Sequence, residues 1–210
     1  MNNLSSFYFE LNDPVGCVKL LNDRLFSGSD DGSLKYYKIS NENFDCVLTM
    51  KSDLPVKSMC LQPNGNDDII VAGVSNDLIG YDTRNGEICY KLKGHTQTVS
   101  CLSSNELSND YRFFDDEVYS DWYIVSGSFD KTLKIWDLRK QECLQTLRGH
   151  KKAVTSVYMR GDRIMSGGAF GENGIVRIWN KNTFKEVRTL DGGVDKINCL
   201  KFDGCHMVSI

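Results

Sequence analysis

The sequence lacks the features that mark several common functional classes. No apolar run approaches the roughly 18 residues of a membrane-spanning helix, and the N-terminal Met-Asn-Asn-Leu-Ser-Ser has neither the basic nor the apolar region of a signal peptide. An excess of positive charge is also absent, because the formal net charge is -3. Such a balance gives no general attraction to nucleic acid or anionic lipid. We therefore expect an intracellular protein, cytoplasmic, nuclear or both, that binds neither nucleic acid nor membrane.

The eight cysteines include no C-x-x-C pair, which argues against a zinc site. Cys17, Cys101 and Cys199 instead occupy one position in three similar segments, Val-Gly-Cys-Val, Val-Ser-Cys-Leu and Ile-Asn-Cys-Leu. Residues that recur in this way are expected to be small, buried side chains of equivalent strands. We predict free thiols, no metal site and no cofactor.

The chain contains one segment that is repeated along its length. The copies at 126–137 and 166–180 are the clearest, more divergent copies begin at Ser27 and Ala72, and the start of a fifth is found at Met207. The aromatic residues that end the copies are separated by 44, 55 and 43 residues, and they are Tyr37, Tyr81, Trp136 and Trp179. A repeat of this size, built from short strands, is the sequence signature of a propeller blade.

The local composition predicts an all-β chain. Segments such as 133–136 and 175–179 are rich in residues that suit a pleated surface, and polar turns such as Asp31-Gly32 separate them. No segment has a sustained helical stripe of apolar residues. The predicted fold is a partial β-propeller, an incomplete ring of four four-stranded blades plus the start of a fifth. Their approximate bounds are 12–50, 51–92, 93–147, 148–190 and, for the partial blade, 191–210.

The third block contains about 15 more residues than its neighbours, and these form the insertion 105–121. Acidic side chains alternate in it with aromatic ones, among them Phe113 and Phe114. One interpretation is a docking segment that becomes ordered on binding a partner. The other is a solvated loop between the first two strands of the blade, on the face opposite the Asp-containing turns.

The repeats closely resemble those of the WD-repeat family. Gly94-His95 and Gly149-His150 match the Gly-His pair of that family, Trp136-Asp137 matches its Trp-Asp dipeptide, and Trp179-Asn180 differs from it by one residue. The resemblance implies a structural tetrad of His, Ser, Asp and Trp inside a blade. The matching residues are His95, Ser126, Asp130 and Trp136 in the third block, and His150, Ser166 and Trp179 in the fourth.

The resemblance also implies that partners are other proteins, bound on the face formed by the loops that lead into each blade and by the turns before the Trp strand. The matching candidate positions are Lys57, Ser100, Phe129, Thr155, Phe170 and Asn198. We predict a non-catalytic interaction scaffold or adaptor. The compact connectors also resemble those of F-box/WD-repeat proteins, and an alternative is therefore a substrate-recognition subunit that binds ubiquitin-ligase components.

A hydrolase that uses Ser126, His95 and Asp130 is the remaining alternative, since these three residue types can form a catalytic triad. The sequence has no G-x-S-x-G elbow to present the serine, and in the WD-repeat interpretation Trp136 holds it. Four blocks and part of a fifth leave strand edges open. We therefore expect a longer parent protein with more than two further blades.

Overall fold

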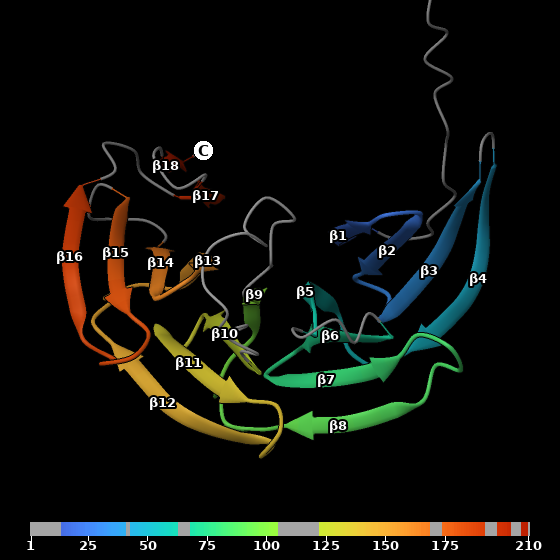
Figure 1. Cartoon of the computed structure of the whole chain (residues 1–210), viewed down its shortest axis with the longest axis horizontal. Coiled ribbons are helices and arrows are strands. Elements are labelled where there is room, and N and C mark those ends of the chain that lie inside the picture. Colours follow the sequence, from blue (N-terminus) through green and yellow to red (C-terminus); the bar gives the residue numbers. More distant parts are fainter. Residues whose placement is uncertain are drawn as a thin grey trace, which may run out of the picture.

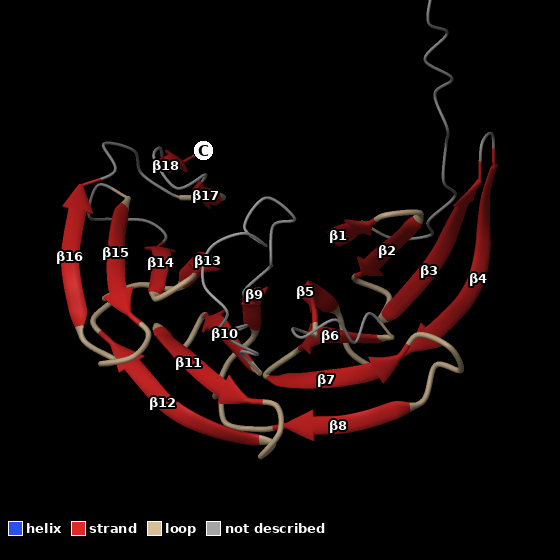
Figure 2. Cartoon of the chain, viewed as in Figure 1, coloured by secondary structure: helices blue, strands red, loops and turns tan. Residues whose placement is uncertain are grey.

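The computed structural model describes residues 14–40, 43–62, 68–104, 122–168, 174–191, 197–202 and 207–209. Within these ranges, strands joined by turns and loops make up the whole structure, as Figure 2 shows. The prediction of an all-β chain is confirmed.

Four antiparallel sheets of four strands follow one another along the chain, and in each sheet the strands pair in chain order. The first sheet contains β1 (Val15–Leu21), β2 (Arg24–Ser29), β3 (Ser33–Ser40) and β4 (Asn43–Lys51). The second contains β5 (Val56–Leu61), β6 (Ile69–Val74), β7 (Asp77–Asp82) and β8 (Ile88–Leu92). We call each sheet a blade and number the blades in chain order.

Blades three and four repeat this plan. Blade three contains β9 (Val99–Ser104), β10 (Tyr123–Ser128), β11 (Thr132–Asp137) and β12 (Glu142–Arg148). Blade four contains β13 (Val154–Arg160), β14 (Arg163–Gly168), β15 (Ile175–Asn180) and β16 (Glu186–Asp191). A two-stranded sheet of β17 (Leu200–Phe202) and β18 (Met207–Ser209) follows.

The blades are arranged around an open arc. In Figure 1 the first strand of each blade lies toward the hollow of the arc, and the fourth strands β4, β8, β12 and β16 lie along its outer side. The described part of the chain does not close the ring. This arrangement confirms the predicted partial propeller of four four-stranded blades and the start of a fifth.

The hydrophobic core lies between consecutive blades. One cluster joins Phe26 and Leu34 of blade one to Val56 and Ile70 of blade two, and further clusters follow at the next three junctions. A single four-stranded sheet buries little apolar surface alone, and it gains most of its stability from its neighbours along the array.

A glycine at each junction lets the next blade approach. The pairs of a glycine and the apolar residue that packs on it are Gly28 with Val56, Gly73 with Val99, Gly127 with Val154, and Gly167 with Ile197. A Cβ atom at Gly127 would lie 2.6 Å from Cγ1 of Val154 and 2.6 Å from Sγ of Cys101. The glycine after each Ser, or after Ala72 in blade two, is therefore a site of close packing between blades.

Candidate functional site

The first strand of each blade contains a β-bulge near its N-terminal end. The residues at these bulges are Gly16, Lys57, Ser100 and Thr155. Because a bulge changes the direction in which a side chain points, it allows a side chain to reach beyond its own sheet. Three of these residues, Lys57, Ser100 and Thr155, are positions that the sequence assigned to partner binding.

Ser100 and Thr155 use their hydroxyl groups between blades. The Ser100 hydroxyl lies within hydrogen-bond distance of two carbonyl oxygens, that of Gly127 at 3.1 Å and that of Val154 in the next blade, which share its single proton. The Thr155 hydroxyl is placed in the same way between the carbonyls of Gly167, at 3.3 Å, and Ile197. Both hydroxyls therefore join adjacent blades, which is a structural role that the sequence analysis did not assign to them.

The other bulge and loop positions differ from these two. The Lys57 ammonium lies 2.6 Å from a carboxylate oxygen of Asp30, so it pairs with the β2–β3 turn of the preceding blade. Asn198 is exposed and lies just before β17. Phe113, Phe114 and Phe170 lie outside the described residues, as does the whole insertion 105–121.

The structure brings the four predicted tetrad residues of blade three together. The Trp136 indole N–H donates to Oγ of Ser126 at 2.8 Å, and Ser126 Oγ lies 2.7 Å from Nε2 of His95. On the other side of the imidazole ring, Nδ1 lies 2.8 Å from Oδ2 of Asp130. The tetrad links the loop before β9 to strands β10 and β11 and to the turn between them.

The protonation pattern follows from the Asp130 carboxylate. Burial opposes ionisation of this group, but hydrogen bonds from Thr132, His95 and the Thr96 backbone N–H outweigh it and lower its pKa to about 2. The ionised carboxylate accepts the Nδ1–H of His95, so Nε2 carries no proton and accepts the hydroxyl of Ser126. Burial of the ring lowers the pKa of His95, and Asp130 opposes that shift. His95 is thus neutral at pH 7.

The same contacts have the connectivity of a Ser-His-Asp triad. Whether their role is catalytic or structural therefore depends on whether a substrate can reach Ser126. Ser126 is 0 % exposed, and its Oγ already accepts the Trp136 N–H. The His95 side chain is also fully buried. A substrate carbonyl cannot reach Ser126 Oγ in this arrangement, which argues against the hydrolase interpretation.

Blade four has a comparable arrangement around His150. The Trp179 N–H donates to Ser166 Oγ at 2.9 Å, and His150 Nε2 lies 2.7 Å from the same oxygen. Burial and the nearby Arg177 cation lower the pKa of His150 to about 4, against a weaker opposing effect of Glu186. The β14–β15 connection corresponds to the turn that carries Asp130 in blade three, and its residues 169–173 lie outside the described residues.

Phe129 is the large apolar side chain that blade three presents to solvent next to its tetrad. It is 46 % exposed and lies in the β10–β11 turn. Its backbone N–H donates to the carbonyl of Thr98 at 3.0 Å, and the Asp130 carboxylate beside it is held by His95. The exposed ring therefore lies on a turn that is held by a backbone hydrogen bond and by the contact between Asp130 and His95.

The sequence did not identify the junction glycines or the bulges. A signal for the glycines was present, because each block has a glycine directly after its Ser or, in blade two, after Ala72. The bulges give no comparable signal, since the bulged positions hold Gly, Lys, Ser and Thr.

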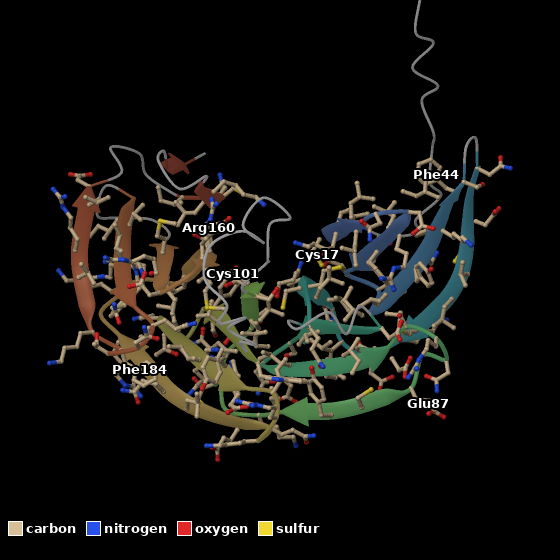
Figure 3. The ribbon with its side chains drawn as sticks, in the orientation of Figure 1. Cys17, Phe44, Glu87, Cys101, Arg160 and Phe184 are labelled. Atoms are coloured by element: carbon tan, nitrogen blue, oxygen red, sulfur yellow. The ribbon has the colours of Figure 1, made fainter. Side chains whose placement is uncertain are left out.

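The described cysteines are free thiols, and among them only Cys60 is buried. Cys17 and Cys101 are half-buried and lie toward the hollow of the arc, whereas Glu87 and Phe184 mark its outer side in Figure 3. Burial raises the pKa of both thiols to about 12. Cys199 is exposed and precedes β17, so the expected burial of this third cysteine is wrong.

Among the described residues, no group of three or more His, Cys, Asp and Glu side chains could hold a metal ion. No helix in the described ranges is long and apolar enough to cross a membrane.

Comparisons with known proteins agree with the geometry. Residues 86–137 and 141–180 match the family model WD40, described as "WD domain, G-beta repeat". The chain is similar to the DENN domain and WD repeat-containing protein SCD1 of Arabidopsis thaliana, with 28 % identity over 93 % of this chain and 14 % of that protein. It is also similar to the COMPASS component SWD3 of Saccharomyces cerevisiae, with 25 % identity over 92 % of this chain and 62 % of that protein.

A solved structure shows the same fold. The crystal structure of the computationally designed Ika8 protein superposes with a TM-score of 0.73 at 21 % identity, covering 93 % of this chain and 54 % of that one. This chain spans between 14 % and 62 % of the length of the two curated relatives. With the repeated blades, the Trp-Ser-His hydrogen bonds and the matching segments together, the chain contains WD repeats, which the family model matches at residues 86–137 and 141–180.

Proposed function

We propose that this chain is a non-catalytic protein-interaction scaffold that binds a partner at the β10–β11 turn, with Phe129 as the apolar anchor. Proteins with WD repeats generally bind other proteins, which supports an interaction role in general terms. The observation that carries the proposal is the exposure of Phe129 on a turn held by the tetrad. A large aromatic ring on a rigid support loses little conformational entropy when it enters a partner's pocket.

The test compares two exposed apolar side chains on different parts of the arc. Partners captured by the immobilised chain from cell extract are first identified and then measured against Phe129→Ala. The matched control is Ile88→Ala, since Ile88 is 58 % exposed on the outer strand β8. Removal of an anchor should weaken binding by at least about tenfold. Equal retention by both variants, or equal loss from both, would exclude the turn as the binding site.

The ubiquitin-ligase alternative stays a prediction. Its support is the resemblance of the short connectors to those of F-box/WD-repeat proteins. The same captured material tests it directly, because ligase components would be recovered with the wild-type chain. Their absence from material that still contains Phe129-dependent partners would remove this alternative.

A further inference from the structure

Basic side chains gather around Phe129 at one end of blade three. We call this surface the blade-three rim, and its residues are Phe129, Lys131, Arg148, Lys151 and Lys152. All five are exposed. Phe129 and Lys131 belong to the turn between β10 and β11, Arg148 is the last residue of β12, and Lys151 and Lys152 belong to the connection from β12 to β13. The turn and the connection lie at the same end of the blade, because β10 and β12 both run antiparallel to β11 and so both finish there.

Strand pairing and packing bring these residues close together. Arg148 is the Cα partner of Thr132, which directly follows Lys131. Val154 packs on Gly127, and Phe129 and Lys152 each lie two residues from this contact toward the rim. Phe129 thus lies at the same end of the blade as cations from the β10–β11 turn, from the end of β12 and from the connection to β13.

The carboxylate in this region points inward. Asp130 lies between Phe129 and Lys131, but its oxygens bind His95, the Thr96 N–H and Thr132. The equivalent end of blade one carries both charges, since its exposed side chains there include Asp31, Asp53 and also Lys51, the counterpart of Arg148. Among the described residues, this end of the arc therefore has mixed charge at blade one and mainly positive charge at blade three.

Resting on the proposed function, we propose that the blade-three rim recognises an acidic protein segment that also carries an apolar side chain. The apolar group packs against Phe129, and neighbouring carboxylates pair with Lys131, Arg148 and Lys152. Such pairs speed association and set orientation, while the buried apolar contact slows dissociation.

A short acidic segment suits this surface better than a nucleic acid. A long polyanion that extended from blade three to blade one would leave the basic residues and reach the mixed charges of Asp31, Lys51 and Asp53, where it gains little attraction. The formal net charge of -3 adds no long-range attraction. The nucleic acid is nevertheless the rival occupant, because bases also stack on exposed aromatic rings.

The experiment measures fluorescence anisotropy of labelled probes with the full chain. The first probe is a short peptide of glutamates around two central leucines. In the second, serines replace the leucines, and in the third, glutamines replace the glutamates. The fourth is a single-stranded oligonucleotide of the same charge as the first peptide.

Two charge-reversal variants separate the rim from general electrostatics. The rim variant carries Lys131→Glu, Arg148→Glu and Lys152→Glu. The matched control carries Arg139→Glu, Lys140→Glu and Lys185→Glu, three exposed cations in turns at the opposite end of blades three and four. Both variants change the net charge equally, so a loss confined to the rim variant is local.

We expect the glutamate–leucine peptide to bind the wild-type chain and to lose at least about tenfold in affinity with the rim variant, with less than about threefold loss in the control. The serine and glutamine peptides should bind at least about tenfold more weakly than the first. The proposal is overturned if no acidic peptide binds, if both variants lose affinity equally, or if the oligonucleotide binds as tightly as the peptide. Those outcomes leave Phe129-dependent capture unaffected, so the failure of this inference differs from that of the proposed function.

Discussion

His95 and His150 occupy equivalent positions in blades three and four, yet they face different charges. The carboxylate of Asp130 accepts a hydrogen bond from His95, whereas His150 lies near the Arg177 cation. The cation and burial both disfavour a charged imidazole, so both lower the pKa of His150.

This difference predicts acid sensitivity that depends on His150. The unfolded chain binds a proton at this residue below its ordinary pKa of 6.5, but the folded chain does so only near its lowered pKa of about 4. The free energy of unfolding therefore falls as the pH drops from about 6.5 to 4, by up to about 3 kcal/mol, and the residue contributes no pH dependence above that window.

The measurement is urea unfolding of wild type and His150→Gln at several pH values across this window. We expect the variant to start from a lower stability at pH 7.5, because Ser166 loses a partner, and to lose less on acidification than wild type. The pH dependence of the free energy of unfolding that remains in the variant comes from His95 and other titratable groups. Parallel curves for the two proteins would show that His150 is not the source.

At the scale of strands and blades, the sequence predicted the blades and the residues that meet inside blade three. The repeated segments and polar turns identified the blades, and the resemblance to WD repeats identified the residues that meet in blade three. The contacts between blades were less predictable, because they depend on three-dimensional approach. Ser100 illustrates this, since a bulge turns its hydroxyl toward the next blade and no residue pattern signals that bulge.

The close approach at Gly127 gives a direct test of the junction between blades three and four. Gly127→Ala places a Cβ 2.6 Å from Sγ of Cys101 and from Cγ1 of Val154, which is fully buried. We expect a loss of roughly 2–3 kcal/mol in the free energy of unfolding, since the packed neighbours must shift.

Gly161→Ala is the control for this change. Its φ of 57° is unfavourable for alanine, but a Cβ there meets nothing within 4 Å. Backbone strain alone should cost only about 1 kcal/mol. Chemical denaturation followed by tryptophan fluorescence compares the two. A Gly127→Ala protein as stable as the Gly161→Ala protein would contradict the packing argument.

Along the arc as a whole, four junctions place the start of a blade against the blade before it, and β1 has no such neighbour in the described part of the chain. Val18 and Leu20 are each 58 % exposed, whereas Val157 and Met159 at the equivalent positions of β13 are 7 % and 1 % exposed. This apolar face of the first strand is therefore covered by blade three at β13 and exposed to solvent at β1.

Paired substitutions measure what that coverage contributes. We expect Val18→Ser with Leu20→Ser to lower the free energy of unfolding by about 1 kcal/mol or less, since both side chains already contact solvent. Val157→Ser with Met159→Ser should cost more than about 4 kcal/mol, because it removes packed apolar groups and buries hydroxyls. Urea unfolding at two protein concentrations is the measurement. A large cost for the β1 pair, together with a concentration-dependent midpoint, would mean that a second copy covers β1 in solution.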